Sequence, residues 1–108
     1  MSTITQNLND RWQKFSTIEQ MANIGSEVGR ALKWKGRDES SFWNTVQRTI
    51  ELFDLTLIDP KTFKRRHEIG IAKEIFCDAV LGGKEYRSTL EDLEKYFMNF
   101  AFYVNNKI

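Results

Sequence analysis

A histidine and the basic residues just before it form the densest group of chemically active side chains in the sequence. In order, this group contains Lys61, Lys64, Arg65, Arg66 and His67. Histidine is the side chain that acts most readily as a general base near neutral pH. Clustered lysine and arginine bind the phosphate groups of RNA or nucleotides. The stretch 61–67, called the basic segment below, is therefore a candidate phosphate-binding site, and Arg30 could add a further positive charge to it.

A surface role is the favoured alternative for the same segment. Consecutive residues of a helix do not face one another, so Arg66, His67 and Glu68 would not form a single site. The net charge of the chain is only +1, and the preceding stretch 38–59 carries one basic and five acidic residues that could pair with the basic segment. We therefore expect no catalytic residue, and nucleic-acid binding is not favoured.

Other chemistries lack the residues they need. The sequence has one histidine and one cysteine. These are too few for a di-iron carboxylate centre or for a structural zinc site. It also contains neither of the glycine-rich loops that hold nucleotide phosphates. We expect no metal and no cofactor, and an enzyme is the less favoured class.

The apolar residues predict an all-α fold, and the 108 residues fit one domain spanning the whole chain, 1–108. Helix boundary signals divide the chain into a short first helix and four long ones. The signals are Asn9–Asp10 at the start of the first helix, a Ser16/Glu19 capping box, Gly36, Asp38, the Asp59–Pro60 pair, Gly82–Gly83 and a Ser88/Glu91 capping box. Short connections favour an antiparallel four-helix bundle with a short extra N-terminal helix.

Two glycines lie inside the helix that follows Ser16. Gly25 and Gly29 are spaced to lie on one helix face. Each glycine costs about 1 kcal/mol relative to alanine, so a compensating contact is expected. Close crossing of two helices is the favoured explanation, and access of a ligand or partner to the backbone is the alternative.

Aromatic residues make up 13% of the chain, and several fall beside the predicted core faces. The last helix is apolar around much of its circumference, which exceeds what one buried face requires. The candidate interface residues are Trp34, Tyr96, Phe100, Phe102 and Tyr103. They favour an interaction module that binds itself or another protein.

The chain has no apolar run of about 18 residues, the length that a membrane span requires. Its start lacks the basic and apolar regions of a signal peptide. The lone Cys77 cannot form an internal disulfide and fits a reducing compartment. We expect a cytoplasmic protein that does not bind membranes.

Three stretches resemble a family of small uncharacterised prokaryotic all-helical proteins. They are 11–28 (RWQKFSTIEQMANIGSEV), 51–60 (ELFDLTLIDP) and 95–97 (KYF). More distantly, the helical architecture resembles HEPN-type bundles, which are partners of minimal nucleotidyltransferases in toxin–antitoxin pairs or metal-independent RNases. The resemblance implies a nucleotidyltransferase-like partner or, as the alternative, RNA processing. The Arg-x4–6-His motif of catalytic HEPN members is not matched, since no arginine precedes His67 at that spacing.

Overall fold

Helices form all the regular secondary structure in the computed structural model, which describes residues 3–105, with side chains from Leu8 onward. In chain order they are α1 (Thr3–Trp12), α2 (Thr17–Trp34), α3 (Glu39–Leu57), the 3-10 helix η1 (Pro60–Arg65), α4 (Arg66–Val80) and α5 (Leu90–Asn105). No strand occurs between residues 3 and 105, so the all-α class predicted from the sequence is confirmed.

The capping box predicted at the start of α2 is present. The backbone N–H of Glu19 donates to Ser16 Oγ at 3.2 Å, and the Ser16 N–H donates to Glu19 Oε1 at 2.9 Å. These two bonds satisfy donors that the first turn of a helix leaves without intrahelical partners. After α2, Gly36 has a φ of +76°, a conformation that glycine adopts without steric cost and that allows the short turn into α3.

Two predicted helix starts were wrong in position. The first helix begins at Thr3, well before the predicted cap at Asn9–Asp10. At the start of α5 the reciprocal bonds join Thr89 and Asp92, one residue beyond the predicted Ser88/Glu91 pair. Thr89 and Asp92 supply the same chemistry as the predicted pair, a hydroxyl and a carboxylate three residues apart, so the sequence pattern fits both positions.

The Asp59–Pro60 pair both ends α3 and opens the next helical segment. The Asp59 carboxylate accepts a hydrogen bond from the Lys61 backbone N–H at 3.0 Å, and Pro60 occupies the first helical position, where its missing N–H is not needed. The turn that follows is the 3-10 helix η1, and the regular helix α4 begins only at Arg66.

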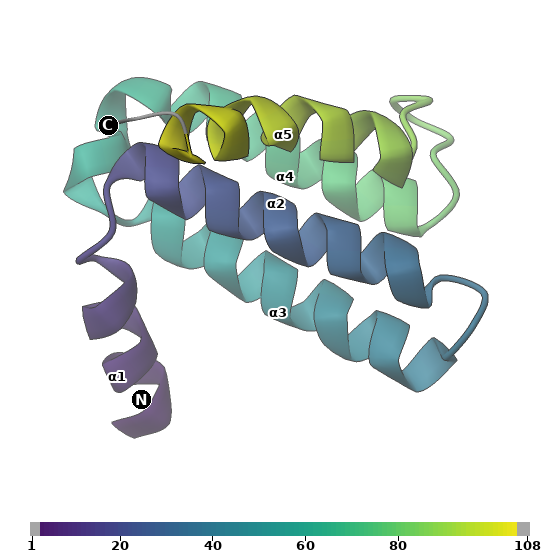
Figure 1. Ribbon diagram of the computed structural model, residues 1–108, viewed down its shortest axis with the longest axis horizontal. Helices are drawn as coiled ribbons and strands as arrows, with labels where there is room; N and C mark the ends of the chain where they lie inside the picture. The colour runs from purple at the N-terminus through teal and green to yellow at the C-terminus, as the bar shows by residue number, and fades with distance from the viewer. Residues whose placement is uncertain (1–2, 106–108) are drawn as a thin grey trace.

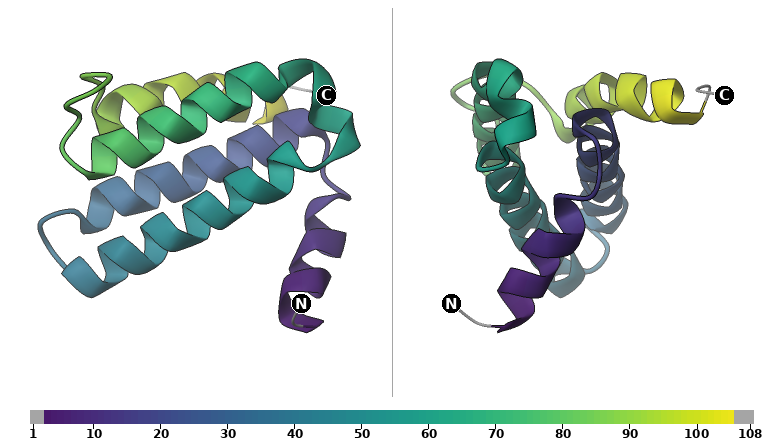
Figure 2. Two further views of the ribbon diagram at one scale, coloured as in Figure 1. Left: turned by 180° about the vertical axis from the view of Figure 1, so that it is seen from behind. Right: turned by 90° about the vertical axis from the view of Figure 1, so that its left-hand side faces the viewer.

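In the folded chain α2 packs against both α3 and α5, while α4 packs against α3 and α5 (Figure 1). Figure 2 shows α1 extending away from the end of these helices, with α3 as its main neighbour. After a short connection α3 lies alongside α2 (Figures 1 and 2).

The core lies where these four helices meet, and its centre is aromatic. The Phe53 ring of α3 lies 5.9 Å from that of Phe76 in α4 and 6.0 Å from that of Phe97 in α5, measured between centroids. All three rings are almost completely buried. From α2, Met21, Ile24 and Val28 complete the centre.

α2 and α5 approach each other closely at Gly25. A Cβ atom added there would lie 2.5 Å from the Cβ of Phe97, which is too close for any side chain. At Gly29 an added Cβ would meet the flexible carboxylate of Glu94 instead, at 2.8 Å from Oε2. The backbone of α2 thus requires glycine at position 25, whereas at position 29 the neighbouring side chain can move aside.

Candidate functional site

The basic segment does not form a single site, because its side chains bind different neighbours. Lys61 turns toward the α1–α2 connection, where its Nζ donates to the Gln13 carbonyl at 2.6 Å and to Asp59 Oδ2 at 2.8 Å. The Arg66 guanidinium lies over the Phe63 ring, 5.3 Å from its centroid. Lys64 and His67 are exposed.

Arg65 points in another direction, toward α5. Its guanidinium lies 5.4 Å from the centroid of the Phe100 ring, and its Nη1 is 4.0 Å from Glu68 Oε1. Arg30 is on α2, where it pairs with Glu27 at 3.0 Å. None of the pockets described for residues 8–105 is lined by a residue of the basic segment.

Asp59 is the centre of a buried hydrogen-bond network that explains the position of the Lys61 side chain. Its carboxylate is 2% exposed and accepts from Lys61 and, at 2.9 Å, from Gln20 Nε2. Burial by itself raises the pKa of this carboxyl, but the hydrogen bonds from Lys61 and Gln20 outweigh burial and leave the pKa below its ordinary value. This arrangement, called the Asp59 network below, joins α2 to η1 at the junction that follows α3.

The predicted interface residues are distributed between core and surface. Phe100 is only 9% exposed and belongs to the core. Trp34 is partly buried against the core, with the Lys33 ammonium 5.4 Å from its ring centroid. Phe102 and Tyr103 are 71% and 56% exposed. Only the last two present most of their surface to solvent.

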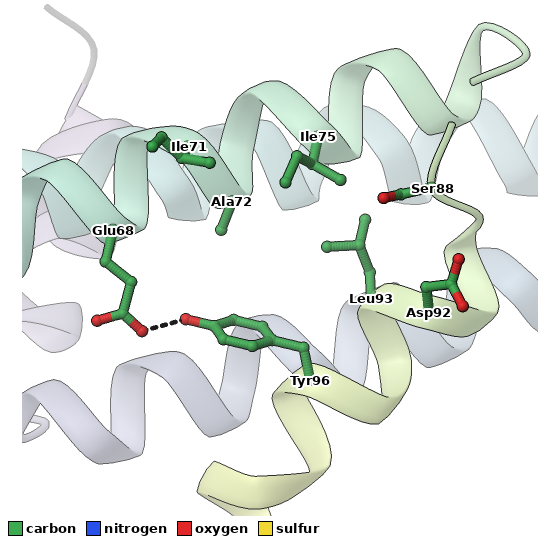
Figure 3. A pocket seen from close by; sticks show the side chains of 8 residues that line it. All are labelled: Glu68, Ile71, Ala72, Ile75, Ser88, Asp92, Leu93 and Tyr96. Carbon is green, nitrogen blue, oxygen red and sulfur yellow. Dashed lines mark hydrogen bonds between the residues drawn. The ribbon is translucent and has the colours of Figure 1, made fainter. Parts of the chain in front are cut away.

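Tyr96 marks one end of an open groove between α4 and α5. Its hydroxyl donates a short hydrogen bond to Glu68 Oε2 across the gap between the two helices. Burial, and then this bond to a carboxylate, raises the pKa of Tyr96 far above its ordinary value, so the phenol stays protonated. Tyr96 and Glu68 together close this end of the groove (Figure 3).

The rest of this groove is apolar and has a volume of about 340 Å³. Ile71, Ala72 and Ile75 of α4 line one side, and Leu93 of α5 faces them (Figure 3). Ser88 and Asp92 lie at the end opposite Tyr96. We call this feature, defined by Glu68, Ile71, Ala72, Ile75, Ser88, Asp92, Leu93 and Tyr96, the α4–α5 groove.

Sequence reasoning identified Tyr96 but missed the groove. Ile71 and Ile75 are four residues apart, so they share one face of α4, and Ile71 is 37% exposed. Together they widen the apolar surface of α4 beyond the fully buried Ile69, Ala72 and Phe76. In the sequence, this wide apolar face of α4 was the feature that could have indicated an apolar surface open to solvent.

Among the described residues, no group of three or more histidine, cysteine, aspartate or glutamate side chains is placed to hold a metal ion. No helix within this part of the chain is long and apolar enough to span a membrane.

The fold and these surfaces define an all-α protein with a buried polar network and an open apolar groove. Comparisons of the chain with models of known protein families, with curated proteins and with solved structures find no match.

Proposed function

We propose that this protein is a non-enzymatic helical interaction module, whose α4–α5 groove receives an amphipathic helix of a partner protein. The observation that carries the proposal is the groove itself, an apolar surface between two helices. An apolar surface left open to water favours burial against a partner. Grooves between helices commonly bind the apolar face of an amphipathic helix.

The dimensions of the groove set the length of the bound helix. On α4 its lining runs from Glu68 to Ile75, about two helical turns or roughly 10 Å. A partner helix would therefore place two or three apolar side chains, spaced three or four residues apart, against Ile71 and Ile75. In this proposal α2 to α5 act as an antiparallel four-helix bundle, and the partner fills the space between α4 and α5.

The charges at the two ends favour a partner with basic flanks. Glu68 lies at one end of the groove and Asp92 at the other. Lysine or arginine placed on either side of the apolar stripe would approach these carboxylates. Such charge complementarity selects among amphipathic helices and sets their direction more than it adds to affinity.

The alternative function, RNA or nucleotide binding through Arg30 and the basic segment, has weaker support. It requires the basic side chains to converge on a concave surface. Lys61 is bonded to Asp59, Arg66 stacks on Phe63 and Arg30 pairs with Glu27. Charges spread over separate neighbours favour the interaction module.

Site-specific photo-crosslinking in cells tests the proposal. A photoreactive residue at Ile71 should crosslink to a discrete partner, and mass spectrometry should locate the crosslink in an amphipathic helix with basic flanks. Leu81 is the matched control, since it is an apolar residue 75% exposed just beyond the end of α4 and outside the groove. The probe at Leu81 should give no such crosslink.

A substitution then links the crosslink to the groove. Ile75→Glu places a charge on the groove wall and should abolish the crosslink from position 71, whereas Leu81→Glu should preserve it. Crosslinking to a second copy of this chain, equal crosslinking from Leu81, or a crosslinked segment without an apolar stripe would each refute the proposed partner.

A further inference from the structure

A second pocket lies between α1, α2 and α3, and it shares none of its lining residues with the α4–α5 groove. Its volume is about 730 Å³, within the range of roughly 300–1,000 Å³ that is typical of small-molecule sites. Four basic residues line it, and we call it the cationic pocket. They are Arg11, Lys14, Arg30 and Arg48.

The basic residues of this pocket come from separate parts of the chain. Arg11 and Lys14 lie at and just after the end of α1, Arg30 lies on α2 and Arg48 on α3. The one carboxylate among the lining residues is Glu27, so four positive charges face one negative charge around a single cavity. Such an excess of positive charge within a concave, partly apolar surface attracts an anion.

Glu27 lies against two of these arginines. The residue is 8% exposed, and its Oε1 lies 3.0 Å from Arg30 and 3.7 Å from Arg48. Its Oε2 is buried and makes no hydrogen bond within the described part of the chain. Because this oxygen is buried, a ligand in the pocket would meet the largely exposed side chains of Arg30 and Arg48 and not Glu27 Oε2.

The remaining walls are apolar and partly aromatic. Trp12 is buried, and its Nε1 donates to Thr56 Oγ1 at 2.9 Å, which attaches the end of α1 to α3. The Phe15 ring packs edge-on against Trp12 at 5.8 Å between centroids and is 39% exposed. The pocket thus offers an aromatic surface beside its positive charges, held in place by a buried hydrogen bond.

We infer that the cationic pocket binds a small organic phosphate with an aromatic body. Arginine recognises phosphate oxygens through several charge-assisted hydrogen bonds. Three arginines and a lysine line the cavity, and two of them, Arg30 and Arg48, also contact Glu27. The aromatic body would lie against the ring of Phe15, which packs on the buried Trp12. This site is independent of the helix-binding role proposed for the α4–α5 groove.

Titration followed by nuclear magnetic resonance tests the inference on the whole chain. Phenyl phosphate should shift the amide signals of residues lining the cationic pocket. It should bind more tightly than inorganic phosphate or phenol, because only phenyl phosphate carries both a phosphate group and an aromatic ring. Adenosine monophosphate also carries a phosphate and an aromatic body, so it should shift the same amide signals.

Two variants with the same change in charge identify the site. Arg11→Ala with Lys14→Ala should weaken phenyl phosphate binding about tenfold or more, as expected for lost charge-assisted contacts. Lys64→Ala with Arg66→Ala, in the basic segment, should leave the affinity unchanged. Because the pocket variant removes neither of the arginines that contact Glu27, the buried carboxylate keeps its partners and folding should be preserved.

The inference is overturned if neither phenyl phosphate nor adenosine monophosphate binds, or if both double variants reduce binding equally. A short single-stranded RNA is included as a third probe. Binding of that RNA without binding of either small phosphate would also overturn the assignment to a small molecule. Loss of the crosslink from Ile71 would not affect these titrations, so the two proposals fail separately.

Discussion

The basic segment and the cationic pocket contain similar side chains but place them in opposite arrangements. In the basic segment, residues adjacent in sequence bind separate neighbours, as Lys61 does with Asp59 and Arg66 with Phe63. In the cationic pocket, basic residues far apart in sequence line one cavity, as Arg11 and Arg48 do. The first arrangement attaches its charges to separate parts of the fold, whereas the second gathers four positive charges around one carboxylate.

The geometry of helices explains this difference. Successive residues of a helix point about 100° apart, so a dense run of basic residues spreads its charges around the axis. Charges converge only where separate helices bring them to one place, as α1, α2 and α3 do around the cationic pocket. A high local density of charge in a sequence is therefore a poor guide to a phosphate site in an all-helical protein.

The largest expected effect concerns Asp59, which binds Lys61 of the basic segment. Asp59→Ala removes the cap of η1 and leaves Gln20 and Lys61 without their carboxylate partner, so the free energy of unfolding should fall by about 2 kcal/mol. Urea denaturation measures this change. Glu51→Ala is the control, because Glu51 is an exposed carboxylate of the adjacent α3 and its removal should change stability little.

If Asp59→Ala and Glu51→Ala gave the same urea midpoint, the Asp59 network would not be the reason that Lys61 is unavailable to a ligand. The contrast between the two basic groups would then lose its structural basis.

A smaller effect should appear in acid. The pKa of Asp59 in the folded protein is below its ordinary value of 3.8. As the pH falls, the Asp59 carboxylate is therefore protonated in the unfolded chain before it is protonated in the folded protein. The stabilisation from the ionised carboxylate is fully present above 3.8 and is lost as the pH drops through the lower folded pKa. Urea midpoints measured from neutral pH into this range should therefore fall more steeply for the natural chain than for Asp59→Asn. Parallel profiles would mean that the Asp59 carboxylate does not contribute to acid sensitivity.

The sequence predicted the parts of this structure that depend on local interactions. The all-α class follows from apolar periodicity, and the Ser16/Glu19 capping box follows from a bond between residues three apart. The Asp59–Pro60 boundary is equally local, since proline restricts the residue before it. The start of α1 was missed because the cap signal at Asn9–Asp10 lies inside a helix that already begins at Thr3.

The parts that could not be predicted depend on how the helices are placed relative to one another. Lys61 bonds to the Gln13 carbonyl, 48 positions away, and nothing local to either residue indicates that contact. The α4–α5 groove presents the same difficulty, since periodicity shows that Ile71 and Ile75 share a face but not what covers it. The cationic pocket requires three helices to be placed before any of its charges meet.

The smallest expected effect comes from one substitution made in each basic group. Lys14→Gln removes a positive charge from the cationic pocket, where like charges repel in the absence of a ligand, so at low salt it should stabilise the fold by a few tenths of a kcal/mol. Lys61→Gln should instead destabilise the fold, because the carboxylate of Asp59 loses its ionic partner. Thermal unfolding of both variants should show these opposite changes in stability.

The same comparison in about 1 M salt, where charges are screened beyond about 3 Å, separates the two causes. The gain from Lys14→Gln should disappear. The loss from Lys61→Gln should largely remain, because it also involves the hydrogen bond to the Gln13 carbonyl. If Lys14→Gln destabilised the fold as Lys61→Gln does, the positive charges of the cationic pocket would be structural as well.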